Sequence, residues 1–550
     1  MTGILGTALS GLMAFQRSLD TTSHNIANVN TEGYSRQRVE LNTQPAQYTA
    51  AGYIGQGVNI AAVSRSYDQF ITNQLTSSTS AFAETHTLST LASQVDAIIA
   101  NESTGLSPAL KSFFNAVNGV ANDPSSMPAR QVMTSEAESL TQQFNTLSSR
   151  FDDFRDQANN QMQASVDDIN SFAGNIATLN GKIIIDSSRA SGGQLPNDLL
   201  DQRDALVAKM AEKISVSTIV QQDGSINVFI GQGQSLVLGV STAKLSLAGS
   251  SVDLSHKNIL IGGLDISKQI TGGELSGALK FRDDVLDPAR QQLGLVAAGF
   301  AVQFNAVQTA GFDLNGNPGA ALFDLGTVPV VAASGSTGSI SAAYDPAGTG
   351  SLNPSDYRLD YNGAAYSLTR LSDNTAITLP ASFPGTPAAV EGMTLAQAAP
   401  PTGTSSFIIR PAFDAAKKLT VVFSDPLKIA AAGSNSPGPP VAAIPGDNTN
   451  ALRLADLEKK AALLGGKATL NDAYGQLVAK ASSSTHAATI SSSAQQVLLN
   501  QATQSRENLA GVNLDEEAAN LIKFQQSYQA AAQVVSVARS LFDTLIGATR

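Results

Sequence analysis

The chain has 550 residues, with 45 acidic and 34 basic side chains and neither cysteine nor tryptophan. At roughly 100 to 200 residues per domain this length predicts several domains, and a hydrophobic content of 42% is enough to build packed cores. The net charge of -11 argues against nucleic-acid binding, which depends on clustered Lys and Arg. The missing cysteines exclude disulfides, thiolate nucleophiles and cysteine-ligated metals.

The N-terminal segment predicts a helix with one apolar seam. No basic residue precedes Arg17, and the apolar residues are spaced rather than continuous. We therefore expect neither a cleavable signal peptide nor a membrane-spanning segment there. Steps of three and four residues, the spacing of a coiled-coil helix, separate the members of the seam, which are Leu5, Ala8, Leu12, Phe15, Leu19, Thr22 and Ile26.

The sequence SHNIANVNTEGYSRQ, residues 23–37, is predicted to end this helix. Asn25, Asn28 and Gly33 tolerate a left-handed backbone and can satisfy the groups at a helix end. On chemistry alone, the motif favours a polar helix terminus.

Three later stretches predict a helical rod. Residues 70–100 and the Ser- and Ala-rich residues 467–505 are expected to be partner helices of a long helix over residues 128–186. In that helix a stutter, which relaxes a supercoil, follows the heptad row. The row and the stutter comprise Met133, Ala137, Leu140, Phe144, Leu147, Phe151 and Phe154, then Ala158, Met162 and Val166.

Residues 214–282 favour β structure. Apolar and polar residues alternate there, and Asp223-Gly224 separates ISVSTIVQQ from SINVFI. This pattern predicts a hairpin.

Residues 326–445 lose helical periodicity and are rich in Gly, Pro, Ala, Ser and Thr. Asn362-Gly363 lies between alternating segments and predicts a hairpin with a type I′ turn. FIIRPAF and KKLTVVF predict two more strands, and the Pro- and Gly-rich residues 433–446 predict a linker back to helix.

The C-terminal helix is predicted to be apolar on more than one side. Asp515, Glu516 and Glu517 open it, where negative charge suits the helix dipole. Its seam comprises Leu521, Phe524, Tyr528, Ala531, Val535, Ala538, Phe542 and Leu545, and a second row comprises Ile522, Val534, Val537, Leu541 and Ile546. Such a helix expects several neighbours.

These elements predict a multidomain, mainly α fold with a terminal coiled coil, a long helical rod, a β-rich hairpin subdomain and an inserted outer β domain. The expected boundaries are 1–66 with 506–550 for the terminal domain, 67–325 with 446–505 for the rod domain carrying the β subdomain at about 214–282, and 326–445 for the outer domain.

The candidate catalytic clusters have simpler structural interpretations. NDLLDQRD, residues 197–204, offers three aspartates, but Asn197 is expected to cap a helix after Pro196. DLNGNP imitates a calcium loop, yet Pro318 stands where glycine is required. The histidines are isolated, and no nucleophile has a plausible base. We therefore expect no catalytic residue, no metal and no cofactor.

Residues 23–37 resemble the N-terminal signature of bacterial flagellar rod, hook and hook-associated proteins. The ending GYSRQ is most similar to the hook-associated protein 1 family, as are NDLLDQRD, GFDLNGNPG, GDNTNAL and GVNLDEEAANLIKFQQSYQAAAQVV. One departure is Glu32, where that family usually has Pro. The resemblance covers roughly residues 1–325 and 446–550.

The resemblance implies a structural protein rather than an enzyme. Such a protein is exported through the flagellar type III export apparatus without a cleaved signal and polymerises with itself at the distal end of the hook, where it joins hook to filament. The implied partners are the hook protein, the next hook-associated protein and a cytoplasmic export chaperone, with no nucleic acid and no membrane insertion. The alternatives are another axial protein, from the hook or distal rod, or an anchored scaffold whose outer domain is an adhesin or hydrolase.

Assembly contacts are expected on both terminal segments, because burying the seam side chains returns less free energy than ordering the backbone of such a segment costs. We expect these ends to be weakly ordered in the monomer and to become fixed when they pack against equivalent helices of neighbouring subunits. The N-terminal candidates are Leu5, Leu12, Phe15, Leu19, Asn25, Ile26, Asn28, Gly33 and Tyr34. The C-terminal candidates, which should also meet the chaperone, are Leu514, Leu521, Phe524, Tyr528, Val535, Phe542 and Leu545.

Overall fold

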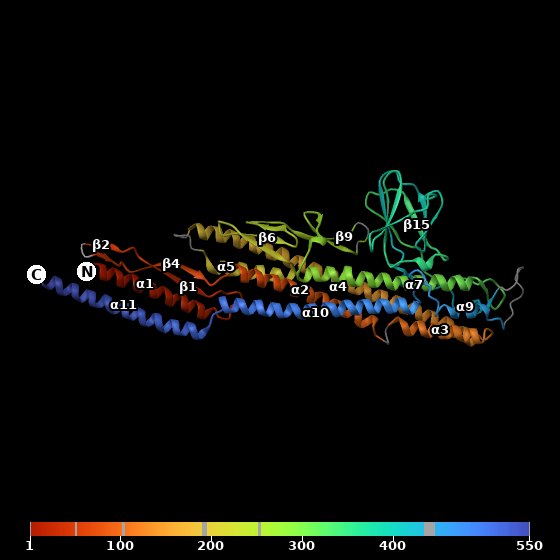
Figure 1. The fold of residues 1–550 in the computed structure, drawn as a ribbon, viewed down its shortest axis with the longest axis horizontal. Coiled ribbons are helices and arrows are strands. Elements are labelled where there is room, and N and C mark those ends of the chain that lie inside the picture. Colours follow the sequence, from red (N-terminus) through yellow and green to blue (C-terminus); the bar gives the residue numbers. More distant parts are fainter. Residues whose placement is uncertain are drawn as a thin grey trace.

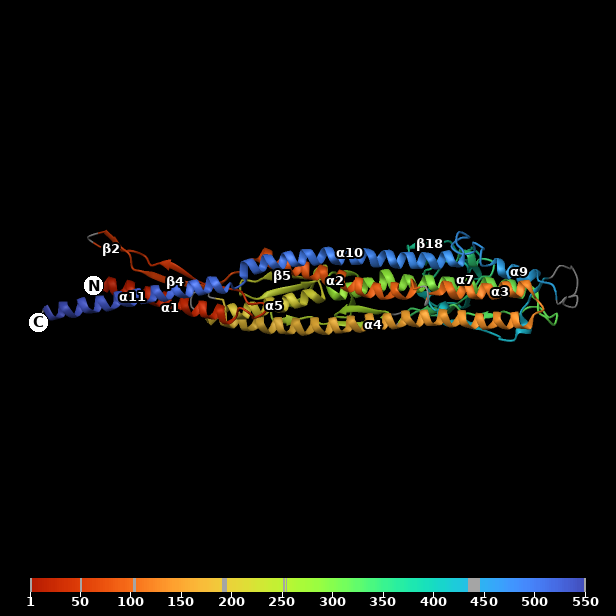
Figure 2. The same ribbon diagram turned by 90° about the horizontal axis from the view of Figure 1, so that it is seen from below.

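The computed structural model describes residues 2–49, 52–101, 105–189, 195–250, 253, 255–433 and 446–548. The molecule is elongated, with a terminal helix pair at one end, a helical rod in the middle and a β domain projecting from the side of the rod (Figure 1). Both chain termini lie at the same end (Figures 1 and 2). The predicted fold class, multidomain and mainly α with β subdomains, is confirmed.

The terminal pair consists of α1 (Thr2–Ala27) and α11 (Leu514–Ala548), which lie side by side and antiparallel. A β ribbon runs beside α1. Its lower part pairs β1 (Gln37–Thr43) with β4 (Val58–Arg65), and its tip pairs β2 (Gln47–Thr49) with β3 (Gly52–Ile54).

The rod is a bundle of long helices, and the helices predicted over 70–100, 128–186 and 467–505 are confirmed. They are α2 (Gln69–Ile99), α4 (Met127–Arg189) and α10 (Leu470–Ala510). With 63 residues and a rise of about 1.5 Å each, α4 spans about 95 Å. The other helical elements before and after the outer domain are α3 (Leu106–Asn122), α5 (Asn197–Lys213), η1 (Ser267–Gln269), α6 (Gly273–Lys280), the π-helical turn η2 (Phe281–Leu286), α7 (Asp287–Thr309) and α9 (Thr449–Asp456).

The predicted heptad row of α4 forms its buried face. Met133, Ala137, Leu140, Phe144 and Phe151 have no exposed surface. Near one end of the rod, the Phe144 ring meets an aromatic cluster of Phe113, Phe114, Phe300, Phe304 and Phe323 from α3, α7 and the strand that follows. Aromatic rings bury large apolar areas, so this cluster anchors the rod core.

The β subdomain lies along α4, and the hairpin predicted at Asp223-Gly224 is confirmed. Gly224 takes a φ of +84°, which favours glycine. The strands end at Asp265, so the last part of the predicted range 214–282 is the helix α6 instead. The two sheets contain β5 (Val216–Val220), β6 (Ile226–Ile230), β7 (Gln234–Leu238) and β8 (Ser241–Thr242), and then β9 (Leu245–Gly249), β10 (Lys257–Ile261) and β11 (Leu264–Asp265).

The outer domain consists of two antiparallel sheets, projecting from the rod (Figure 1). The five-stranded sheet has the order β14 (Val330–Ala332), β21 (Ser405–Ile409), β16 (Tyr357–Tyr361), β17 (Tyr366–Arg370), β18 (Thr375–Ile377). The three-stranded sheet has the order β15 (Ser339–Tyr344), β20 (Met393–Ala399), β19 (Ala388–Val390). A short 3-10 turn, η3 (Thr349–Ser351), lies between β15 and β16 in the chain.

The hairpin at Asn362-Gly363 is confirmed, but the predicted type I′ turn is wrong. Tyr361 pairs with Tyr366, so the loop has four residues rather than two. Asn362 is absent from the described residues with positive φ, whereas a type I′ turn needs two. Its Oδ1 instead accepts hydrogen bonds from the backbone of Ala364 and Ala365, each at 2.9 Å.

Beyond β21 the chain returns to the rod. β13 (Phe323–Asp324) pairs with β22 (Thr420–Val421), and β12 (Gly311–Phe312) pairs with β23 (Ala432–Gly433). The strand expected from KKLTVVF is thus short, and its lysines end the helix α8 (Ala415–Lys418). η4 (Pro426–Lys428) follows. Residues 434–445 of the expected linker lie outside the described residues. Within the described chain, no helix has the length and apolar character to cross a membrane.

Candidate assembly site

The terminal helix pair leaves much of its predicted seam only partly covered. Along α1 the fully buried side chains are small or polar: Ala8, Ala14, Ser18, Thr21, Thr22 and Asn25. The larger seam residues Leu12, Phe15, Leu19 and Ile26 are half-buried, as are Leu521, Phe524, Tyr528 and Val535 on α11. Leu5, Leu514 and Phe542 are exposed, and the side chain of Leu545 lies outside the described residues. One partner helix covers only one side of each seam.

A second apolar surface of the pair faces solvent. The predicted second row of α11, namely Ile522, Val534, Val537, Leu541 and Ile546, is exposed, and so are Ile4, Leu9 and Met13 of α1. Rows of exposed large apolar side chains favour an interaction surface.

Three long stretches at the same end of the molecule carry no charge. Residues 2–16 of α1, 41–64 of the ribbon and 524–538 of α11 contain no Asp, Glu, Lys or Arg. Depletion of charge is the compositional signature of an interface core. The three segments are therefore the candidate core of an assembly interface.

Asn25 organises the turn that follows α1. Its Oδ1 accepts hydrogen bonds from the Gln37 backbone at 2.9 Å and the Tyr34 hydroxyl at 2.7 Å. Its Nδ2 donates to the Gln37 carbonyl at 3.0 Å and to Glu517 at 3.2 Å. The side chain therefore ties α1 to β1 and α11, rather than capping the helix as expected. Every hydrogen-bonding position of the amide is used.

Asn28 and Gly33 behave as the sequence predicts. Asn28 Nδ2 donates to the His24 carbonyl at 3.0 Å, satisfying the end of α1. Gly33 has a φ of +81°, and a Cβ at this position would lie 3.0 Å from the Cβ of Ala205 on α5. A side chain would be strained in backbone and would press α5 away.

Arg36 joins the N-terminal segment to the start of α11. Its guanidinium contacts Glu517 at 2.7 Å and Glu516 at 2.6 Å. The three acids lie in the first turn of α11 as predicted, and two of them also pair with Arg36. The Asn513 side chain accepts the backbone N–H of Asp515 at 2.9 Å and caps the helix. A guanidinium bonded to two carboxylates fixes both position and orientation.

The motif NDLLDQRD on α5 supplies the third side of this polar joint. Asp201 accepts the Ser35 backbone N–H and an Arg65 N–H, both at 2.8 Å, and Asp204 contacts Arg65 at 2.7 Å. The prediction that Asn197 caps α5 is wrong. Its side chain donates to the Val63 carbonyl of β4 at 2.8 Å, because β4 lies against the helix start.

Tyr34 and Arg65 of the joint keep fixed protonation states. Burial, with Asp198, Asp201 and Glu517 nearby, raises the pKa of Tyr34, so its hydroxyl remains a donor. Burial opposes the charge of Arg65, but Asp204 and Asp201 outweigh it and raise its pKa. A permanently charged guanidinium and a protonated phenol position neighbours and do not transfer protons.

Sequence reasoning missed Arg36, Arg65, Asp201 and Glu517 as partners. Each except Arg65 lies in a motif that the sequence singled out, so the motifs themselves were the available signal. Their pairing across the chain had no local signature. The structure brings residues 23–37, 197–204 and 511–517 together at one joint.

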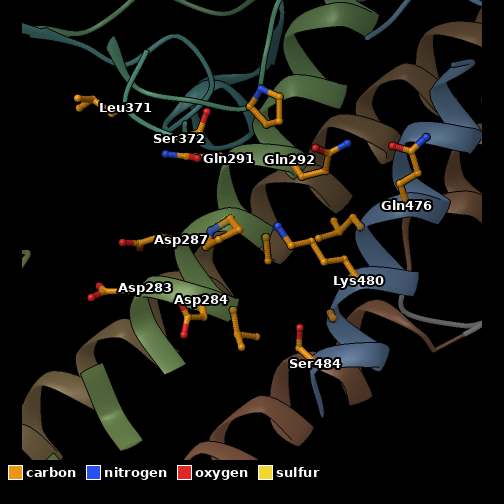
Figure 3. Close-up of a pocket in the computed structure, with 16 residues that line it drawn as sticks. Asp283, Asp284, Asp287, Gln291, Gln292, Leu371, Ser372, Gln476, Lys480 and Ser484 are labelled. Atoms are coloured by element: carbon orange, nitrogen blue, oxygen red, sulfur yellow. The ribbon is translucent and has the colours of Figure 1, made fainter. Parts of the chain in front are cut away.

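A separate cavity of about 430 Å³ lies where the π-helical turn faces α10 and the outer domain. Figure 3 shows Asp283, Asp284 and Asp287 on the α7 side and Lys480 on α10. Asp283 pairs with Arg282 at 2.8 Å. Among the described residues, no group of three or more His, Cys, Asp or Glu could hold a metal ion.

Comparison with known protein families gives four matches along the chain. The model of the flagellar hook-associated protein FlgK helical domain matches residues 92–323, and that of a D2-like domain of flagellar hook-associated protein 1 matches 331–411. The flagella basal body rod protein model matches 5–34, and the flagellar basal body rod FlgEFG protein C-terminal model matches 503–548.

Full-length relatives agree with these matches. Flagellar hook-associated protein 1 of Escherichia coli K12 is 33% identical, over 99% of this chain and 100% of its own length. The Salmonella typhimurium protein of the same name is 34% identical over the same shares, and that of Bacillus subtilis is 27% identical over 98% and 97%. The structure of the flagellar hook junction protein FlgK from Burkholderia pseudomallei aligns with a TM-score of 0.70 at 25% identity, covering 80% of this chain and 100% of that one.

Proposed function

The chain belongs to the flagellar hook-associated protein 1 family, and from this premise we propose that it is a structural component of the bacterial flagellum that polymerises at the distal end of the hook and joins hook to filament. One observation carries the proposal. The two segments that match the rod-protein models form a helix pair with long uncharged stretches, and its apolar rows stay open to solvent.

The domains have distinct proposed roles. Residues 1–66 and 506–550 would form the inner tube, with assembly contacts through the seam residues of α1 and α11 named above. The rod, 67–325 and 446–505, would surround that tube, and the inserted domain, 326–445, would lie outermost. The polar joint supports this division, because it fixes the terminal pair to the rod through directional contacts.

The proposed partners are those that membership of this family implies. They are further copies of this chain, the hook protein on one side and the next hook-associated protein on the other. Before assembly, an export chaperone would shield α11, where Val534, Val537 and Leu541 are exposed, and the flagellar type III apparatus would carry the chain out of the cell. The role is mechanical rather than catalytic, and the mature protein is part of the extracellular flagellum.

A charge-insertion experiment tests the proposal. In cells that lack their own copy of the gene, Leu521→Asp combined with Phe524→Asp should abolish filament attachment and swimming, since two carboxylates would be placed in the half-buried seam. The matched control, Gln525→Asp with Gln529→Asp, adds the same charge at exposed positions of α11 and should swim. Circular dichroism should show both variants folded. Normal swimming by the seam variant would contradict the proposed role of the terminal helices.

A further inference from the structure

The tip of the β ribbon carries two exposed tyrosines. Tyr48 and Tyr53 lie directly opposite each other on β2 and β3, are 72% and 77% exposed, and have ring centroids 5.2 Å apart. Figure 2 shows the tip leaving the helix pair at an angle. An isolated two-stranded ribbon is marginally stable in water, and tyrosines of this kind are favoured as interface anchors. The tip is therefore suited to bind another surface through its two tyrosines.

A groove between α1 and α11 is suited to receive such a tip. Its volume is about 750 Å³, and small residues line it, including Gly3, Thr7 and Gly11 from α1 and Ser527 and Ala530 from α11. A Cβ added at Gly3 would meet no atom within 4 Å. The groove is therefore open enough to receive side chains, and its volume is typical of sites that bury a ligand.

The end of β3 in the same chain's ribbon forms part of the groove rim. Ile54 and Gly55 line it together with the two helices. Tyr53 directly precedes Ile54 on β3. Because adjacent side chains of a strand point to opposite faces, the Tyr48–Tyr53 pair lies on the face of the ribbon opposite Ile54. The tyrosine rings of one chain are thus on the face turned away from its own groove.

Tip and groove are also matched in charge. No charged side chain lines the groove, and the ribbon between Glu40 and Arg65 has none. An occupant with charged groups would lose their hydration on entering such a groove. The uncharged tip would not, so the chemistry favours this segment of a second copy over a charged peptide.

We propose that the Tyr48–Tyr53 tip of one copy docks in the α1–α11 groove of a neighbouring copy. This contact rests on the proposed function and specifies how copies recognise one another. Because tip and groove are different surfaces, the contact is heterologous and repeats from copy to copy, building a ring or a helical tube rather than a closed two-fold dimer.

The absence of cysteine from the chain allows a direct test by cross-linking. Cells lacking their own gene would express two singly substituted chains, one with Tyr53→Cys and one with Ser527→Cys in the groove, and isolated hook–filament junctions would be treated with a short bifunctional maleimide. The matched control replaces Ser527→Cys with Ser536→Cys. Ser536 is exposed and lies nine residues on, about two and a half turns, so it is on the opposite face of α11.

The expected product is a band of twice the chain mass, at least about ten-fold stronger with Ser527→Cys than with Ser536→Cys. Equal bands, or none, in cells that attach filaments would overturn the docking contact and leave the proposed function intact. Failure of the unsubstituted gene to restore filaments would instead count against the proposed function.

A further variant tests the contact independently. Tyr48→Ser with Tyr53→Ser should reduce filament attachment at least about ten-fold with unchanged circular dichroism. Normal attachment by that variant would also overturn the contact.

Discussion

Arg36 and Glu517 are separated by 481 residues in sequence, and 2.7 Å separates their side chains in the fold. Glu517 is almost completely buried, while its neighbour Glu516 contacts the same guanidinium from the surface. The contact holds the end of the first segment against the beginning of the last one. It lies at the joint between the proposed inner tube and the rod.

Glu517→Gln should loosen this joint. Removing one partner of a buried ion pair costs about 3 to 5 kcal/mol, and we expect the lower end of that range because Glu516 remains. Hydrogen exchange in the first turns of α11 should accelerate by about 100-fold. The matched variant Glu516→Gln removes a carboxylate whose side chain is 59% exposed and should change exchange by less than about ten-fold. Equal effects of the two substitutions would show that burial does not govern the joint.

Arg410→Met should free the outer domain from the β subdomain. Arg410 contacts Asp356 of its own domain at 3.0 Å and Asp253 of the β subdomain at 2.8 Å. Its guanidinium also lies over the Phe413 ring, 3.3 Å from the centroid. Small-angle X-ray scattering should show a broader range of domain positions in the variant. Arg358→Met, which removes a more exposed pair with Asp360 within the domain, should leave the scattering unchanged.

His256 and Asp287 should make opposing contributions to pH dependence. Their side chains are 3.7 Å apart. Burial, with Arg282 nearby, lowers the pKa of His256 to about 4, and burial raises the pKa of Asp287 to about 6. Between pH 4 and 6.5 the unfolded histidine holds more protons than the folded one, so its contribution to stability rises with pH. Between pH 4 and 6 the folded aspartate holds more protons than the unfolded one, so its contribution falls with pH.

Thermal unfolding at pH 4, 5, 6 and 7 would separate the two contributions. Relative to the unsubstituted protein, Asp287→Asn should have a Tm that rises more steeply between pH 4 and 6. His256→Gln should have a Tm that falls over the same interval. Parallel curves for all three proteins would contradict the assigned pKa shifts.

Asn180 should be essential for docking the β subdomain on α4. It has no exposed surface; its Nδ2 donates to the carbonyls of Ile226 at 2.8 Å and Gly239 at 2.7 Å, and its Oδ1 accepts the Ile226 N–H at 3.1 Å. Asn180→Leu would leave these backbone groups unpaired, at about 1 to 3 kcal/mol each. Exchange at β6 should accelerate at least about ten-fold, whereas Asn160→Leu, at an exposed position of the same helix, should not change it.

The long elements could be predicted because their periodicity is strong. The 63-residue helix α4 has an unbroken apolar row, and Asp223-Gly224 specifies its turn through local chemistry alone. In contrast, α7 was not predicted because it is buried nearly all round, from Leu293 to Phe304, and has no polar face to reveal a period. The turn type predicted at Asn362-Gly363 was wrong because the same dipeptide also suits a longer loop in which the Asn side chain accepts backbone hydrogen bonds.

The assembly site divides in the same way. Seam residues such as Phe15 and Phe524 follow from spacing, and the structure places them on adjoining helices. The polar joint does not follow from spacing, because its partners come from segments far apart in the chain. Asn197 illustrates the difference: as a local signal it suits a helix cap, but a carbonyl of β4 lies within reach and takes its side chain.

The pairing of β13 with β22, where the chain leaves the rod for the outer domain and returns, has a consequence for protein engineering. Residues on the way out and on the way back meet as an antiparallel pair, Phe323 with Val421, so the excursion begins and ends at neighbouring points on the rod. The entropic cost of closing such a loop grows only slowly with its length. The stability of the rod should therefore depend little on the size of the domain inserted at this point. A foreign domain whose N- and C-termini lie close together could be inserted there and displayed on the outer surface of the flagellum.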